Sequence, residues 1–423
     1  MSAAGYWPSP WPGEDGGPHR PGAPPAGAPT PDLTTDPDAV EVTARDVIAA
    51  TMVVLRDPGE VFLLGHTFGP DATAWVERVD PVTLAPLARS ADLPGGPAWP
   101  GGIAAHADGS LHVVFGNHAH RLDPALDVRA SATLPRHRPY NSFVVLPDGH
   151  LVTKDFAGRL PGDTGPPVDE PAELLVLHPE SLAIVARATA PEPSVARISA
   201  LDDTVYVVGT HGLHRFDWDG ARLRHDPDFA PVYRTRPGQT YGWDATIALG
   251  AAWFLDDGEG SERFAGSFRG LGISEAPLQL VRVGLDDGAV STTEICGRPG
   301  GLIANPPVVD PMRRIVIGYD SANAVVAAFD VAPDGSTRPR WSRTQDHACH
   351  PLILPERGVV VTDDHDAERG MDQVVVLDVE TGAERLRVDS GSPWQSVLFP
   401  AVGFADDIYL CSFTTLTRVA ARR

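Results

Sequence analysis

The chain has 423 residues, including 42 glycines and 42 prolines, and its formal net charge is −22. Glycine and proline together form about a fifth of the residues, compared with roughly 12% in an average protein. Both residues break helices, so the composition excludes long helices and a coiled coil. The negative charge repels phosphate backbones and anionic lipid, so we expect no nucleic-acid or membrane partner.

Residues 1–39 predict a disordered tail rich in proline and glycine, because the first 40 residues contain ten prolines and six glycines. Its segment 6–13, YWPSPWPG, offers a docking motif for a protein partner. The N-terminus lacks a basic start followed by an apolar run, so we expect no secretory signal. No stretch approaches the roughly 18 apolar residues of a membrane span. The three cysteines lie far apart, which is typical of a reducing cytoplasm.

Residues 40–423 predict a single domain, because a short alternating strand followed by a turn recurs throughout them. Clear copies lie at 75–85, 119–127, 174–183, 213–221, 280–289, 326–336 and 374–384. A strand pair joined by a tight turn precedes each copy, and these turns recur about every 50 residues between positions 58 and 406. Four short antiparallel strands repeated eight times predict an all-β fold, a β-propeller with eight four-stranded blades. Seven blades are the alternative.

The eighth repeat ends after its third strand, which leaves one sheet edge unpaired. The segment VEVTARDVI, residues 40–48, precedes the first repeat and has the composition of a strand. We therefore expect this N-terminal strand to complete the last blade and close the ring.

The segment VVVLDVETGAERLRV, residues 374–388, resembles the repeat of the quinoprotein-like propeller superfamily. In that repeat an Asp-x-x-Thr-Gly turn joins the two outer strands. The resemblance implies the scaffold, and it weakens in the other repeats. The superfamily's tryptophan-docking pattern is absent from the sequence, so the resemblance does not imply a pyrroloquinoline quinone (PQQ) cofactor.

One face of the predicted ring carries the long connections between the second and third strands of the blades. These connections span residues 66–74, 154–171, 256–277 and 363–372. Long loops on one face of a rigid scaffold are where binding residues usually lie. They also offer a surface to a protein partner.

The starts of the innermost strands border the axial funnel on the same face. Aromatic residues there provide flat apolar walls, and Asn, Gln and Arg provide directed hydrogen bonds, a mixture typical of a site for a polar small molecule. The expected ligand-binding residues are Trp99, Tyr140, Asn141, Arg197, Trp243, Asn305, Trp394 and Gln395.

Titratable residues on this face predict acid and base groups. Carboxylates brought together raise one another's pKa, whereas a nearby cation lowers it, so such a cluster supplies both roles near neutral pH. Lys154 stands out because it is the only lysine of the chain. The candidate catalytic residues are Lys154, His347, His350, Asp244 and Asp364.

A divalent metal such as Ca²⁺ is a further candidate, bound by residues chosen from His118, His120, Asp363 and His365. The segment ANPPVVDP, residues 304–311, resembles the strand that carries the first iron-binding histidine in carotenoid-cleaving oxygenase propellers. Asn305 stands where that histidine should be, so the resemblance does not supply the ligand.

These patterns favour a cytoplasmic propeller that binds a polar small molecule in its funnel. If it is an enzyme, acid/base chemistry of the hydrolase, lyase or isomerase type fits the residues best. A non-catalytic scaffold for proteins and a metal-dependent oxygenase are the alternatives.

Overall fold

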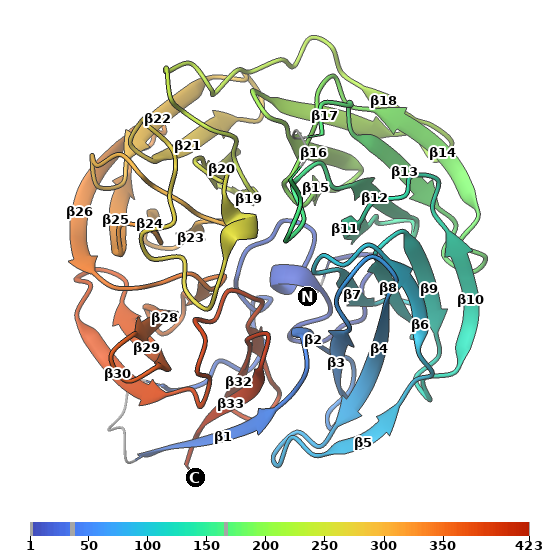
Figure 1. The fold of residues 1–423 in the computed structure, drawn as a ribbon. Helices are drawn as coiled ribbons and strands as arrows, with labels where there is room; N and C mark the ends of the chain where they lie inside the picture. Colours follow the sequence, from blue (N-terminus) through green and yellow to red (C-terminus); the bar gives the residue numbers. More distant parts are fainter. Residues whose placement is uncertain (1–2, 34–38, 165–167, 423) are drawn as a thin grey trace.

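The computed structural model describes residues 3–33, 39–164 and 168–422. Its strands form a ring of eight sheets around a central axis (Figure 1). Each sheet is one blade, and its strands follow one another from the axis outward. This confirms the predicted eight-bladed propeller. No described residue belongs to a helix with the length and apolar character needed to cross a membrane.

The first four blades repeat the same antiparallel order. Blade one contains β2 (Ala50–Leu55), β3 (Val61–His66), β4 (Ala72–Val79) and β5 (Pro86–Arg89), and β6 (Leu93–Gly96) also pairs with β4. Blade two contains β7 (Gly102–Ala105), β8 (Leu111–Phe115), β9 (His118–Leu122) and β10 (Val128–Thr133). Blade three contains β11 (Tyr140–Val145), β12 (Leu151–Asp155), β13 (Glu173–Leu177) and β14 (Ile184–Thr189). Blade four contains β15 (Ser199–Leu201), β16 (Thr204–Val208), β17 (Leu213–Trp218) and β18 (Leu223–His225).

The next three blades continue the pattern around the ring. Blade five contains β19 (Thr246–Ala248), β20 (Ala251–Leu255), β21 (Gln279–Gly284) and β22 (Val290–Glu294). Blade six contains β23 (Val308–Asp310), β24 (Ile315–Asp320), β25 (Val325–Val331) and β26 (Thr337–Thr344). Blade seven contains β27 (Leu352–Leu354), β28 (Val359–Asp366), β29 (Met371–Asp378) and β30 (Glu384–Asp389). The short 3-10 segments η1 (Glu14–Gly16) and η3 (Ser261–Arg263) accompany the strands.

Blade eight joins the two ends of the propeller domain. Its inner strands are β31 (Ala401–Val402), β32 (Asp407–Cys411) and β33 (Thr415–Ala421), and β1 (Val40–Asp46) is the outermost strand. β1 pairs with β33 in antiparallel register from Val40 opposite Ala421 to Asp46 opposite Thr415. The predicted closure by an N-terminal strand is therefore confirmed.

Burial follows the distance from the axis. The second strands of blades one and six, β3 and β24, are buried along their whole length, since β-branched and aromatic side chains pack against both neighbouring blades. The outermost strands, such as β14, alternate between exposed and half-buried residues. The apolar core therefore lies between the blades, and the loops are free to carry a site.

The loop predicted at 363–372 differs from the structure. β28 extends to Asp366, and β29 begins at Met371, so most of this segment forms a paired hairpin. Asp363 and Asp364 thus lie inside a strand.

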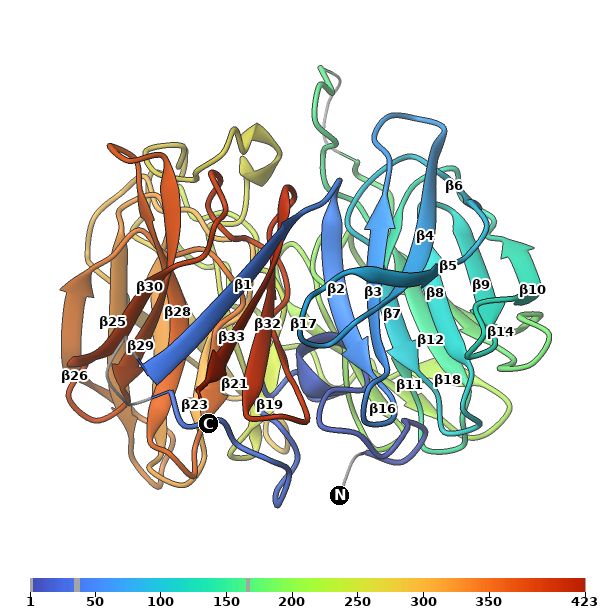
Figure 2. The ribbon, with the colours of Figure 1, turned by 90° about the horizontal axis from the view of Figure 1, so that it is seen from below.

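The prediction of a disordered tail is wrong for residues 3–33. Trp11 is fully buried, and η1 lies in the centre of the ring (Figure 1). Figure 2 shows that this segment enters from the face opposite the long loop that contains η3. Residues 34–38, also part of the predicted tail, lie outside the described residues.

Backbone hydrogen bonds explain why this segment is held. Innermost strands have no neighbour on the axial side, so their inward amides need other acceptors. The N-terminal segment provides them, because its carbonyl oxygens accept hydrogen bonds from five blades. The donors are the amides of Leu55, Ala105, Ala200, Ile247 and Ile353.

Candidate functional site

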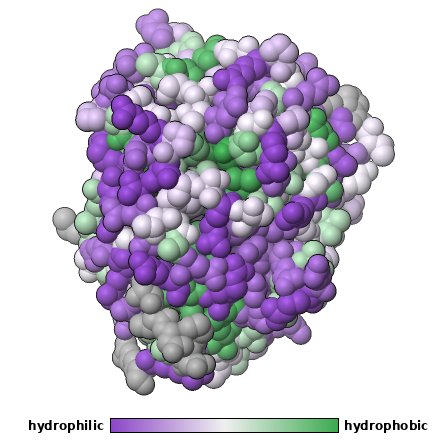
Figure 3. All heavy atoms as spheres, turned by 90° about the vertical axis from the view of Figure 1, so that its left-hand side faces the viewer, coloured by the Kyte–Doolittle hydropathy of each residue, from purple (hydrophilic) through white to green (hydrophobic). Residues whose placement is uncertain are grey.

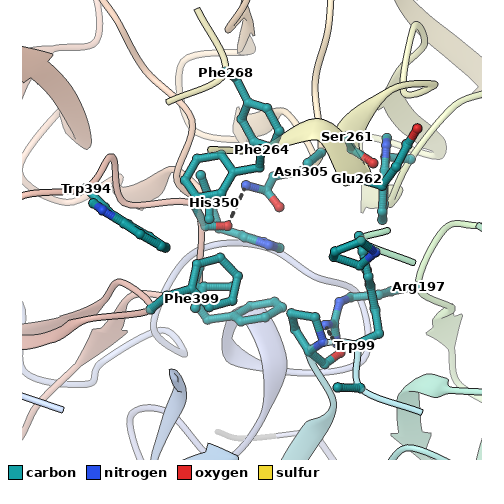
Figure 4. Close-up of a pocket in the computed structure, with 18 of the residues that line it drawn as sticks. Trp99, Arg197, Ser261, Glu262, Phe264, Phe268, Asn305, His350, Trp394 and Phe399 are labelled. Carbon is teal, nitrogen blue, oxygen red and sulfur yellow. Dashed lines mark hydrogen bonds between the residues drawn. The ribbon is translucent and has the colours of Figure 1, made fainter. Parts of the chain in front are cut away.

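A cavity of about 390 Å³ lies in the axial funnel on the face of the long loops. Its walls are mainly apolar, and most of their aromatic residues come from the segments of blades two, five and eight, including the long loop of blade five (Figure 4). The aromatic residues that line it include Trp99, Trp243, Phe264, Phe268, Trp394 and Phe399. Such a lining favours a ligand with a flat or extended apolar body.

His350 provides a polar group at the floor of the cavity. It precedes β27, and its ring packs on Phe399 with a centroid distance of 4.0 Å. Its Nδ1 lies 2.8 Å from Oδ1 of Asp15 in η1. A carboxylate at Nδ1 fixes the ring and directs Nε2 to whatever occupies the cavity. Figure 4 shows the ring of His350 reaching in between the aromatic side chains.

Asp15 is suited to this role because it stays ionised. Burial alone would raise the pKa of its carboxyl, but His350 and Arg20 outweigh burial and lower the pKa to about 2. Arg20 Nη1 lies 2.9 Å from the second oxygen of Asp15. Asp15 also has a left-handed backbone, with φ of 49°, which is uncommon for a residue other than glycine and is found mainly at constrained sites.

Asn305 provides the second polar atom. Its side-chain amide donates to the backbone oxygens of Ala348 and Val397, the latter at 3.0 Å. These two acceptors use the NH₂ group and leave Oδ1 without a partner in the described part of the chain. Oδ1 points into the cavity in Figure 4. The cavity thus offers a hydrogen-bond acceptor beside an imidazole.

Arg197 lines the cavity, but its charge is already balanced beneath it. Its guanidinium lies 4.5 Å from the centroid of the Phe399 ring and 3.2 Å from Oε1 of Glu14. It also donates to the backbone oxygen of Pro100 at 2.7 Å. Asp244 accepts the backbone amide of Arg197 at 2.6 Å, and burial raises the pKa of Asp244. Arg197 therefore holds the floor together rather than attracting an anion.

The structure places six of the sequence-predicted residues on the cavity wall. They are Trp99, Arg197, Trp243, Asn305, His350 and Trp394. Three other ligand-binding candidates point elsewhere. Tyr140 donates to Glu173, Asn141 donates to the backbone of Val195, and Gln395 bonds Asp346 and accepts the amide of Phe268. Gln395 thereby fixes the long loop of blade five.

Four catalytic candidates lie outside the cavity wall. Lys154 is fully buried, and its Nζ donates to the backbone oxygens of Asp155 and Ser194, both at 2.9 Å. Burial lowers the pKa of Lys154 to about 8, although Asp155 and Asp244 oppose this effect. Asp244 lies behind Arg197, as described above. The other two lie in blade seven, where His347 contacts Asp363 and Asp364 bonds Arg387. The structure therefore brings only His350 of the five to the cavity.

The metal candidates do not meet at one point. His118 bonds the backbone of Gly95, and His120 bonds Ser131 and the backbone of Pro94. Burial lowers the pKa of His120 to about 4. His365 and Asp363 lie in β28 of blade seven, far from the two histidines in β9 of blade two. His365 bonds the backbone of Pro393, whereas Asp363 lies with His347 and Cys349. Among the described residues, neither possible metal cluster contains three histidines, as the oxygenase alternative would require.

The N-terminal segment contributes charged residues to the floor of the cavity, which its sequence was not expected to do. Glu14, Asp15 and Arg20 form a buried charge cluster at the axis and reach Ser142, Arg197 and His350. A signal was available, because two tryptophans and an acidic pair are unusual in a solvated linker.

The similar solved structures share this fold. No family model and no curated protein sequence matches the chain. The quinohemoprotein alcohol dehydrogenase from Comamonas testosteroni superposes with a TM-score of 0.64 at 11% identity, covering 98% of this chain and 81% of that one. BamB from Moraxella catarrhalis gives 0.55 at 14%, covering 88% and 100%, and a europium-containing methanol dehydrogenase gives 0.61 at 10%, covering 95% and 89%. The chain thus shares the propeller fold of these structures, and at these identities the similarity extends to the fold alone.

Proposed function

We propose that the axial cavity binds a small molecule with an aromatic or extended apolar body and one hydroxyl or amino group. The single observation that carries this proposal is the pairing of His350 with Asp15 beneath an aromatic cavity. The sequence predicts a polar small molecule. The cavity favours one whose polar group lies at one end of an apolar body.

The hydroxyl or amino group follows from the two polar atoms on offer. Nδ1 of His350 lies 2.8 Å from the Asp15 carboxylate, so a neutral imidazole protonated at Nδ1 would present Nε2 as an acceptor, and Asn305 Oδ1 is also an acceptor. A ligand donor satisfies either atom. A bare carboxylate or phosphate does not, and Arg197 is already balanced by Glu14.

The same pair supports acid/base catalysis of the hydrolase, lyase or isomerase type. A carboxylate that orients Nδ1 leaves Nε2 to accept a proton from a bound substrate and to return it later in the reaction. Asp15 stabilises the imidazolium that exists between these two proton transfers. Its pKa of about 2 means that the Asp15 carboxyl stays charged at neutral pH. This role requires no other titratable side chain at the cavity.

The proposal places the protein in the cytoplasm. Its three cysteines are free thiols in the structure, and thiols persist in a reducing compartment.

Matched ligands test the binding proposal. 4-Propylphenol and 4-propylanisole share an aromatic body, but the ether lacks the hydrogen-bond donor. We expect calorimetric titration to show tighter binding of the phenol, and His350→Gln to reduce its affinity roughly threefold to tenfold, the value of one hydrogen bond. His365→Gln is the control, since His365 lies outside the cavity wall.

Two results would contradict the proposal. Equal binding of the phenol and the ether would remove the role of His350 and Asn305. An absence of binding by both would reject the cavity as a small-molecule site and favour the non-catalytic scaffold.

A further inference from the structure

A second group of buried polar side chains lies in blade seven, apart from the axial cavity. Asp363 belongs to β28 and Asp372 to the neighbouring strand β29, whereas His347 and Cys349 lie in the segment between β26 and β27. All four side chains are at most 2% exposed. None of them lines the axial cavity.

Asp363 is the centre of this group. Its Oδ1 lies 2.6 Å from Nδ1 of His347 and accepts the backbone amides of Ala348 and Cys349. One donor atom each from His347, Cys349 and Asp363 lies within 4.8 Å of the other two. Asp372, on the neighbouring strand β29, interacts electrostatically with Asp363, and its Oδ2 accepts a hydrogen bond from the Ser396 hydroxyl at 2.6 Å.

Several atoms of the group lack a hydrogen-bond partner among the described residues. They are Oδ2 of Asp363, Oδ1 of Asp372 and Nε2 of His347. Buried polar atoms are nearly always paired, so an unpartnered set in one place points to a missing ligand.

Within the part of the chain that the structure describes, no arginine or lysine forms an ion pair with Asp363 or Asp372. At the matching strand end of blade three, Asp155 is balanced by Arg136 at 2.8 Å and Arg138 at 3.2 Å. Among the described residues, the ionic contact of Asp363 is with His347 alone. The charge of the two carboxyl groups is therefore balanced either by a proton or by a bound cation.

We propose that His347, Cys349, Asp363 and Asp372 bind one divalent transition metal ion of the zinc type. An imidazole nitrogen, a thiolate and carboxylate oxygens form a donor set that Zn²⁺ prefers. Ca²⁺ takes oxygen ligands only, so the thiol and imidazole disfavour the Ca²⁺ expected from the acidic sequence pattern. Binding releases the Cys349 thiol proton, because the thiolate is the form that binds a metal ion.

Cobalt provides a direct test, since Co²⁺ occupies zinc-type sites and reports on its ligands. The ion must enter during folding because the group is buried, so the full chain is produced in cells grown with Co²⁺. We expect elemental analysis to find about one cobalt per chain. We also expect a near-ultraviolet thiolate-to-cobalt charge-transfer band.

Two substitutions identify the ligands. Cys349→Ser should abolish the charge-transfer band, and the isosteric Asp372→Asn should reduce bound cobalt roughly tenfold or more. Cys411→Ser is the matched control, because Cys411 is also a buried thiol but lies in β32 of blade eight. It should retain both the band and the metal.

The wild-type protein decides the question even if a variant fails to fold. Purified wild-type chain without stoichiometric cobalt and without the band would overturn the proposal. A band that survives in folded Cys349→Ser would also overturn it.

Discussion

Oδ1 of Asp15 lies 2.8 Å from Nδ1 of His350, which joins the N-terminal segment to the segment that precedes β27. The contact has no counterpart in the blade repeat, since Asp15 lies in η1 and belongs to none of the eight blades. It makes the floor of the axial cavity depend on a part of the chain that composition alone assigns to a solvated tail.

Asp15→Asn tests how strongly this floor depends on charge. The substitution removes a carboxylate that faces both His350 and Arg20 in a buried cluster. Removal of one partner from a buried ion pair destabilises strongly, so we expect a loss of roughly 3 kcal/mol in the free energy of unfolding at neutral pH. Urea unfolding measures it. Asp92→Asn, which breaks an exposed pair with Arg89, should cost less than about 1 kcal/mol.

The stabilisation that Asp15 provides should depend on pH. The pKa of the Asp15 carboxyl falls from 3.8 to about 2 on folding, so the unfolded chain takes up a proton at this residue first as the pH drops. The stabilisation by Asp15 is therefore complete above pH 4 and is lost between about pH 4 and pH 2. We expect the difference in unfolding free energy between wild type and Asp15→Asn to shrink over that window. A constant difference would contradict the assignment.

Trp11→Ala tests whether residues 3–33 form part of the folded domain. Trp11 is fully buried, and its carbonyl oxygen accepts the amide of Leu55 in β2. Truncation of a buried tryptophan costs about 3–5 kcal/mol through lost burial and the cavity that remains. Thermal and urea unfolding should both show this loss. Leu87→Ala, at an exposed position of β5, should be nearly neutral, whereas equal stability of Trp11→Ala and wild type would mean that the segment does not contribute.

Lys154→Met tests the buried lysine. Burial lowers the pKa of Lys154 from 10.5 to about 8 in the folded chain. Between these values the unfolded chain binds a proton that the folded chain lacks, so the free energy of unfolding rises with pH. We expect the stability of wild type relative to Lys154→Met to increase by about 3 kcal/mol between pH 8 and pH 10.5. Urea unfolding at four pH values across this range measures it, and a flat difference would show that the lysine titrates as it does in water.

The architecture was predictable because its signals repeat. Turns at a constant period and one unpaired last strand indicate the blades and the strand that closes them, and β1 on β33 confirms the closure. The N-terminal segment was not predictable in the same way. Its proline and glycine content dominates any average, whereas its placement depends on Trp11, Glu14, Asp15 and Arg20, whose partners lie in distant blades.

The sequence could predict that the segments before the innermost strands border the candidate site. It could not predict which side chains of those segments face the cavity. Adjacent residues in an extended chain point to opposite sides. Of two neighbours such as Trp394 and Gln395, one side chain therefore lines the cavity and the other does not. Trp394 faces the cavity, whereas Gln395 turns inward to Asp346. The sequence contains both residues without indicating which one faces the axis.

The hydrogen bonds of the N-terminal segment also constrain the order of assembly. Residues 3–33 precede the blades in the chain, yet their partners on blades one, two, four, five and seven become available only as those blades form. β1 likewise pairs with β33, which follows all seven of the other blades in the chain. The segment at the axis therefore obtains its full set of partners only after blade seven has formed, and the axial cavity gains its floor at that stage.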